Sequence, residues 1–185
     1  MDPKEIYRRS SAEFGHRVHA VGDRWDARTP CPDWDARALV NHLVNEERWT
    51  PPLLGGATIA EIGDRFDGDL LGADAVATFD EASAAALAAV EAVDLDSAVH
   101  LSFGDPPARE YVTQLAADHL VHAWDLARAL GVDETLDAET VDAVLGWFGS
   151  TEELYRQIDV IGPRADVPAD AGPLDTLVAR FGRKP

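Results

Sequence analysis

A mostly apolar stretch, ADHLVHAWDLARAL at residues 117–130, carries Asp118, His119 and His122 among its leucines, alanines and a tryptophan. A carboxylate or an imidazole that is buried without a partner costs several kcal/mol of folding free energy. On a helix, Asp118 and His122 lie about 40° apart around the axis and about one turn apart along it. Two donors at positions i and i+4 are how a helix offers a metal ion two ligands. The spacing therefore predicts either half of a metal site or an Asp–His hydrogen bond at a contact between helices.

A third donor, His42, falls on a different predicted helix, on the flank of its apolar stripe beside Leu39, and Glu46 follows one turn later. Two histidines and one carboxylate leave coordination positions open for water or substrate, as a catalytic metal requires. We therefore predict that His42, Asp118 and His122 bind one divalent ion. The alternative for His42 is a half-buried, hydrogen-bonded histidine. Glu46 is a candidate general base or a partner of the ligands, and the alternative is an ordinary solvated glutamate.

The remaining histidines fit such a site less well. His119 is turned by about 100° from Asp118 around the helix axis, so the two cannot easily share one ion. His16 and His19 fall outside the apolar stripe of the first predicted helix and are expected to face solvent. His100 falls in a predicted loop.

The only cysteine, Cys31, lies between two prolines before a predicted helix. A lone cysteine excludes an internal disulfide and fits a reducing compartment. The start of a helix would favour a nucleophilic thiolate, but no histidine is near Cys31 in sequence, and we predict a structural, partly buried side chain. Trp34, Trp49 and Trp124 are candidates for lining a pocket, with core or rim packing as the alternative.

Apolar residues recur at helical spacing in most of the chain, which predicts an all-α protein. Asp35 and Asp137 are expected N-caps, Asp105 with Pro106 begins a further helix, and Gly131 ends it. The connector 51–73 is expected to hold one helical turn near Ile59. The predicted helices span residues 4–25, 36–50, 74–93, 106–130, 138–156 and 173–181. We expect one domain over 1–185, a four-helix bundle core at about 4–131 with additional helices in a C-terminal extension at 132–185.

Composition excludes several classes of function. The chain has 185 residues and a formal net charge of −18, which would repel a phosphate backbone, so nucleic acid is not an expected partner. No apolar run approaches the roughly 20 residues that span a membrane. The first residues lack the apolar segment of a signal peptide. We therefore expect a cytoplasmic protein, monomeric or homodimeric, that acts on small molecules.

Three segments resemble the DinB-like metal-binding superfamily: TPCPDWDARALVNHLVNEERWTPPLL, DHLVHAWDLARALG and VPADAGPLDTLVARFGRKP. Within it they are most similar to the actinobacterial branch around mycothiol-dependent maleylpyruvate isomerase. The resemblance implies a four-helix bundle that binds a divalent metal through His42, Asp118 and His122, with mycothiol as the thiol. Asp118 stands where the isomerase has glutamate. We also expect the chain to be too short for the isomerase's separate C-terminal domain, so maleylpyruvate itself is not the expected substrate.

The function that these observations favour is a metal-dependent mycothiol S-transferase or isomerase that acts on a small electrophile. A bound metal stabilises a thiolate far more than the thiol, and so provides the nucleophile. Zn²⁺ is the expected metal, with Ni²⁺ or Fe²⁺ as alternatives. Three other functions stay open: a non-catalytic metal-binding stress protein, a hydrolase that uses metal-bound water, and a non-haem iron oxygenase.

Overall fold

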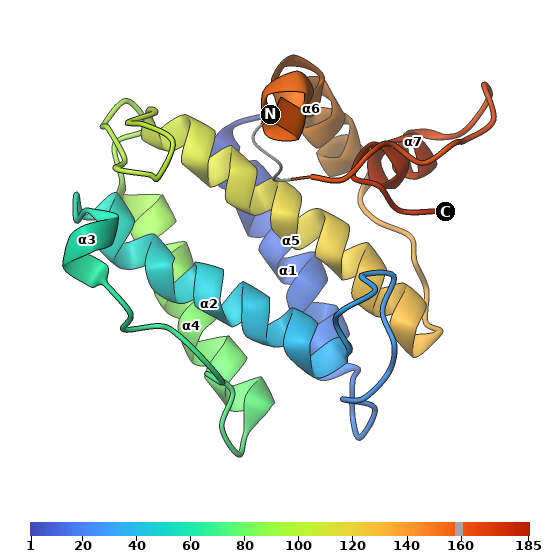
Figure 1. Ribbon diagram of the computed structural model, residues 1–185, viewed down its shortest axis with the longest axis horizontal. Helices are drawn as coiled ribbons and strands as arrows, with labels where there is room; N and C mark the ends of the chain where they lie inside the picture. Colours follow the sequence, from blue (N-terminus) through green and yellow to red (C-terminus); the bar gives the residue numbers. More distant parts are fainter. Residues whose placement is uncertain (158–160) are drawn as a thin grey trace.

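The computed structural model describes residues 1–157 and 161–185, and every helix or strand assigned in these ranges is an α-helix (Figure 1). This confirms the all-α prediction. Three isolated β-bridges pin the loops but form no strand within the described residues. The helices are α1 (Pro3–His19), α2 (Ala36–Leu54), α3 (Ile59–Ile62), α4 (Ala75–Ala92), α5 (Ala108–Leu130), α6 (Ala138–Gln157) and α7 (Pro173–Arg180).

Four long helices, α1, α2, α4 and α5, form a bundle, and α6 and α7 are added to it (Figure 1). The largest helix contacts pair α1 with α5 and α2 with α4, whereas α2 and α5 contact each other less extensively. The helices α6 and α7 pack on each other, and α6 also contacts α1 and α5. The C-terminal extension therefore lies against α5, the helix that carries Asp118 and His122.

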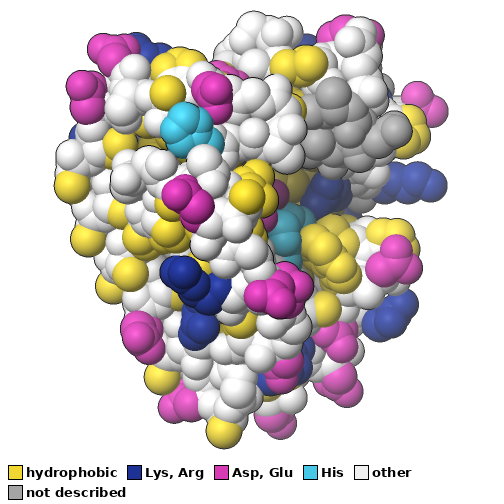
Figure 2. Space-filling model, turned by 60° about the vertical axis from the view of Figure 1, so that its left-hand side comes forward, with side chains coloured by type: hydrophobic (Ala, Val, Ile, Leu, Met, Phe, Trp, Pro, Cys, Tyr) yellow, Lys and Arg dark blue, Asp and Glu magenta, His cyan; other side chains and the backbone are white. Residues whose placement is uncertain are grey.

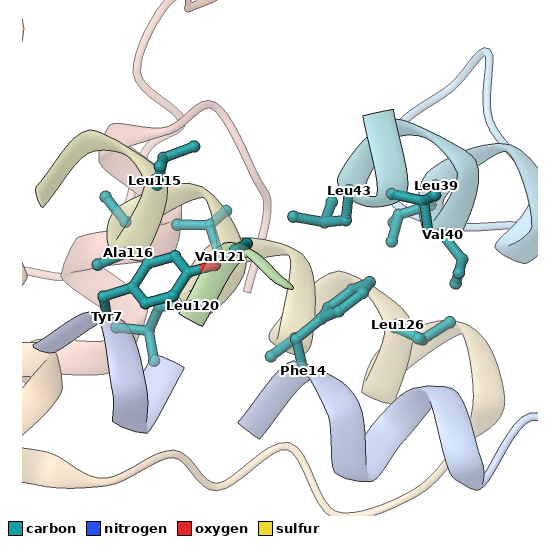
Figure 3. Close-up of a cluster of buried hydrophobic side chains, with 14 of the residues drawn as sticks. Tyr7, Phe14, Leu39, Val40, Leu43, Leu115, Ala116, Leu120, Val121 and Leu126 are labelled. Atoms are coloured by element: carbon teal, nitrogen blue, oxygen red, sulfur yellow. The ribbon is translucent and has the colours of Figure 1, made fainter. Parts of the chain in front are cut away.

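The bundle has an apolar core that does not depend on any ion. Figure 3 shows side chains from three helices that meet in this core. Each large apolar side chain that is fully buried stabilises the fold by about 1.5–3 kcal/mol. The labelled residues are Tyr7, Phe14, Leu39, Val40, Leu43, Leu115, Ala116, Leu120, Val121 and Leu126.

Two predicted helix ends were wrong. Helix α1 ends at His19 rather than at residue 25, because the chain turns at Gly22, whose φ is 61°. Val21, between the helix end and Gly22, is nevertheless buried, so the apolar spacing continues without the helix. Helix α2 continues through Pro51 to Leu54 instead of ending near residue 50. The two prolines fall in its last turn. Each lacks the N–H that would bond to the carbonyl oxygen four residues earlier, and the helix ends two residues after Pro52.

The predicted start of the α5 helix was also wrong. Asp105 does not cap it: its carboxylate lies 2.7 Å from His100 Nδ1 in the preceding loop. The N-cap is Pro107, and the helix starts at Ala108. Gly131 ends the helix in the left-handed conformation, with φ at 64°, as predicted. Asp35 caps α2 through the backbone N–H of Ala38, also as predicted.

No helix in the described part of the chain is long and apolar enough to cross a membrane.

Candidate metal centre

His42 of α2 and two residues of α5, Asp118 and His122, lie together between the two helices. Asp118 Oδ2 is 3.0 Å from His42 Nε2, and Asp118 Oδ1 is 3.4 Å from His122 Nε2. One ligand atom from each residue falls within 4.8 Å of the other two. The i, i+4 spacing brings Asp118 and His122 together, and the packing of α2 near α5 adds His42. A carboxylate bridges two imidazoles here.

A second carboxylate, that of Asp125, fixes the orientation of His122. Asp125 Oδ2 lies 2.9 Å from His122 Nδ1, which leaves the opposite ring nitrogen, Nε2, facing Asp118. Asp125 is fully buried and is itself held by Arg183, whose Nη2 donates to Asp125 Oδ2 at 2.7 Å. Arg183 Nη1 donates to the carbonyl oxygen of Phe181 at 2.8 Å. Metal-ligating histidines commonly donate their other ring N–H to a carboxylate in this way.

The charges in this cluster stabilise one another. Burial alone would raise the pKa of Asp118, but the charges of His122 and His42, and hydrogen bonds to them, lower it well below its usual value. Burial would lower the pKa of His122, but the carboxylates of Asp118 and Asp125 raise it well above its usual value. Burial likewise would raise the pKa of Asp125, which His122 and Arg183 lower. A cation shared by Asp118 and the two histidines would supply positive charge beside this carboxylate.

The residues present fit a divalent ion at His42, Asp118 and His122. All three donor atoms face one point, and nitrogen and oxygen donors of these types suit a first-row divalent metal. A second group of possible ligands, Cys31 with Asp125 and His122, fits less well. The Arg183 guanidinium lies 3.2 Å from Cys31 Sγ and 2.7 Å from Asp125 Oδ2, so it already supplies the positive charge there.

Cys31 lies closer to the site than its position in the sequence suggested. Its thiol is 3.5 Å from Asp125 Oδ2, and the side chain is partly buried, as predicted. Cys31 also lines the cavity beside the histidines. The role of packing alone therefore stays a prediction, which a substitution tests below.

Glu46 lines the same cavity, one helical turn after His42. Burial raises the pKa of the Glu46 carboxyl, and the nearby charge of Asp118 raises it further. Of the three tryptophans, Trp34 is the one that faces the cavity, with its ring centroid 4.7 Å from that of His42. Trp49 packs against Phe66 instead.

His119 points away from the cluster into the core of the bundle. It is fully buried: its Nε2 lies 3.0 Å from Glu47 Oε1, and its Nδ1 donates to the carbonyl oxygen of Leu115 at 2.8 Å. His16 and His19 are exposed, as predicted. His119 is thus hydrogen-bonded on both nitrogens and is separate from the candidate ligands.

A cavity of about 450 Å³ opens above the three candidate ligands. The face in Figure 2 is hollowed, and histidine and hydrophobic side chains are visible there. One wall comes from the loop before α2, a second from α5, and a third from the C-terminal extension. The lining residues are Cys31, Pro32, Asp33, Trp34, His42, Glu46, Gln114, Leu115, Ala117, Asp118, Val121, His122, Trp147, Tyr155, Ile161, Phe181 and Arg183.

Sequence reasoning did not identify Asp125 and Arg183. Asp125 follows His122 by three residues, a spacing that places both on one helix face, so a search for partners of His122 would have found it. Arg183 contacts Asp125 across 58 positions, and no local pattern signals that contact. The one indication was the resemblance of the segment that contains it.

Comparison with known proteins identifies a family. Residues 7–127 match the family model of the mycothiol maleylpyruvate isomerase N-terminal domain. The chain belongs to this family, which confirms the resemblance to the DinB-like, mycothiol-related branch. It is thus a helical domain of a metal-binding, mycothiol-related family.

Two similar relatives are the uncharacterized proteins MT0763 and Rv0738 of Mycobacterium tuberculosis, strains CDC 1551 / Oshkosh and ATCC 25618 / H37Rv. Each is 29% identical over 199 residues, which cover 99% of this chain and 98% of the relative. Their names state no activity. No solved structure matches the chain.

Proposed function

We propose that this protein binds a divalent metal ion through His42, Asp118 and His122 and uses it to activate a small thiol, mycothiol, for reaction with a small electrophile. The observation that supports this most directly is the convergence of the three donors at the floor of a 450 Å³ cavity. Membership of a mycothiol-related family supports the choice of thiol. The net charge of −18 supports small molecules rather than nucleic acid as partners.

The metal, when bound, supplies a positive charge that favours the thiolate over the thiol. Zn²⁺ suits the two imidazoles and one carboxylate with positions left open, and Ni²⁺ and Fe²⁺ are the alternatives. The Glu46 carboxylate lies in the same cavity, and its raised pKa suits it to take the proton of the thiol. Asp125 holds His122 in the tautomer with Nε2 free.

The activated sulfur then reacts in one of two ways. Displacement forms a sulfur–carbon bond while the leaving group departs with its electron pair, and the outcome is S-transfer. Addition to an activated double bond, rotation about the resulting single bond and loss of the thiol give isomerisation. Trp34 and the C-terminal extension limit access of water to the sulfur, because they enclose the cavity on two sides.

The experiment combines metal analysis with an assay of thiol consumption. Purified protein should contain about one divalent ion per chain, and it should consume mycothiol in the presence of a suitable electrophile. Removal of the ion with a chelator should abolish turnover, and Zn²⁺ should restore it. A protein that binds the ion but consumes no thiol with any electrophile would instead be a non-catalytic metal-binding protein.

A further inference from the structure

One wall of the cavity is built from aromatic residues of the C-terminal extension, and the candidate metal ligands line the same cavity. Trp147 and Tyr155 of α6 line the cavity together with Phe181, which follows α7. These residues fall outside the segment 7–127 that matches the family model. The family model therefore does not cover this aromatic wall.

The aromatic wall is held firmly in place. The Trp147 indole Nε1 donates to both carboxylate oxygens of Glu110, at 3.1 and 3.0 Å. Its ring centroid lies 5.9 Å from that of Tyr155, and Phe181 stacks on Phe148 at 4.1 Å. Rings that are already fixed lose little conformational entropy when a flat ligand packs on them.

The charged groups of the cavity disfavour an anionic ligand. Among the described lining residues, Arg183 has the one permanently charged cationic side chain. Its guanidinium is already engaged by Asp125, by the carbonyl oxygen of Phe181 and by Cys31 Sγ. Glu46 and Asp33 add negative charge to the lining. In the metal-free protein, a carboxylate placed against the wall would lose its hydration, which is costly. Arg183 and His122 would not offset this cost, because both are already paired with carboxylates of the protein.

We infer that the electrophile is an uncharged, largely apolar molecule, flat enough to stack on Trp147 and Tyr155, and not a carboxylate. That this ligand reacts as an electrophile rests on the proposed function. The preference of the aromatic wall for a neutral, flat ligand does not require the metal. Aromatic stacking supplies the affinity. The discrimination comes from the lining of the metal-free cavity, where Arg183, His42 and His122 are each already paired with a carboxylate.

The test measures binding of two unreactive ligands to metal-free protein by calorimetry. The ligands are 1,3-dinitrobenzene, which is neutral, and 3,5-dinitrobenzoate, which adds one carboxylate to the same ring. We expect the neutral ligand to bind at least about tenfold more tightly, a difference of about 1.4 kcal/mol. Equal or tighter binding of the benzoate would overturn the inference.

Variants locate the binding surface. Trp147→Leu should weaken binding of dinitrobenzene by about tenfold, whereas Trp49→Leu, which removes a ring that packs on Phe66 outside the cavity, should change it less than about twofold. Tyr155→Leu serves as the second wall variant if Trp147→Leu does not fold, as judged by circular dichroism. Unchanged dinitrobenzene binding in a folded wall variant would refute the inference.

The same variants separate this inference from the proposed function. In metal-loaded protein, a wall variant should raise the KM for a neutral nitroaromatic electrophile and leave the KM for mycothiol nearly unchanged. A rise in the KM for mycothiol alone would assign the wall to the thiol and overturn the inference. If the neutral ligand binds as expected but no thiol is consumed, the proposed function fails and the preference of the wall stands.

Discussion

Arg183 and Asp125 form an ion pair across 58 positions of the chain, with Arg183 Nη2 2.7 Å from Asp125 Oδ2. The same carboxylate oxygen lies 2.9 Å from His122 Nδ1. The Asp125 carboxylate of α5 thus links Arg183 of the C-terminal extension to the candidate metal ligand His122. Because Asp125 is fully buried, solvent does not reach its carboxylate to replace a lost partner.

The first prediction concerns Asp125→Asn. This substitution keeps the size of the side chain but removes the charge that holds the proton on His122 Nδ1. We expect the affinity for Zn²⁺ to fall by about 10–100-fold, the usual cost of losing a carboxylate behind a metal-binding histidine. Competition titration with a chromophoric chelator measures it. Asp133→Asn, at an exposed turn after α5, is the control and should bind Zn²⁺ as the unsubstituted protein does.

Affinity equal to that of the unsubstituted protein in a folded Asp125→Asn variant would show that Asp125 does not support a metal ligand.

Cys31→Ser distinguishes the two possible ligand groups. If the ion is held by His42, Asp118 and His122, the variant should retain its metal content and most of its thiol-dependent activity. The positive charge of Arg183 beside Cys31 would repel a metal ion bound there. Metal analysis of the purified variant measures this. Loss of the ion from a folded Cys31→Ser variant would favour the group of Cys31, Asp125 and His122 instead.

The part of the fold and of the site that the sequence predicts is the part set by local spacing. Asp118 and His122 share a helix face because they are four residues apart, and Asp35 caps α2 because capping involves neighbouring residues. Contacts between distant segments could not be derived in this way. The pairing of Cys31 with Asp125 spans 94 positions and depends on how the loop before α2 folds back on α5.

Predicted helix ends failed for the same kind of reason. Val21 keeps the apolar spacing of α1 and is buried, but it lies in a turn rather than in the helix. Arg24, which follows this turn, donates to the carbonyl oxygen of Leu130 at the end of α5. Asp105 has the residue type of an N-cap, but its carboxylate pairs with His100 in the preceding loop. In both places a contact outside the helix decided where the helix ends or begins.

His119→Ala should affect stability rather than metal binding. It leaves the fully buried Glu47 carboxyl without its imidazole partner. Removing one member of a buried pair typically costs about 3–5 kcal/mol of unfolding free energy. Urea unfolding measures this, and His19→Ala, at an exposed position, should stay within about 0.5 kcal/mol of the unsubstituted protein. Equal stability of the two variants would contradict the importance of the Glu47–His119 contact.

The packing within the C-terminal extension should weaken in acid because of Glu152. This buried carboxylate contacts Arg156, Arg164 and Arg180. Burial alone would raise its pKa, but the guanidinium groups of Arg164 and Arg156 lower it below its ordinary value of 4.5. Since the pKa is lowered in the folded state, the stabilisation is present above the unfolded-state value and is lost as the pH falls through the folded-state value.

Glu152→Gln tests this pH dependence. The variant should be about 1–3 kcal/mol less stable than the unsubstituted protein near neutral pH, and the difference should shrink as the pH falls below 4.5. Denaturant unfolding at a series of pH values measures it. Glu153→Gln, at the exposed neighbouring position, should show no such dependence. A difference that stays constant with pH would exclude this role for the Glu152 carboxylate.

The most direct test of the metal centre is the metal content of His122→Ala beside that of His119→Ala, each purified in the same way and checked for helix content by circular dichroism. We predict that His122→Ala loses nearly all bound metal while it keeps its helices, because the apolar core does not depend on the ion. His119→Ala, measured well below its unfolding temperature, should retain the ion, and His19→Ala replaces it if it does not fold. Equal retention of metal by His122→Ala and the control variant would contradict the proposed ligands.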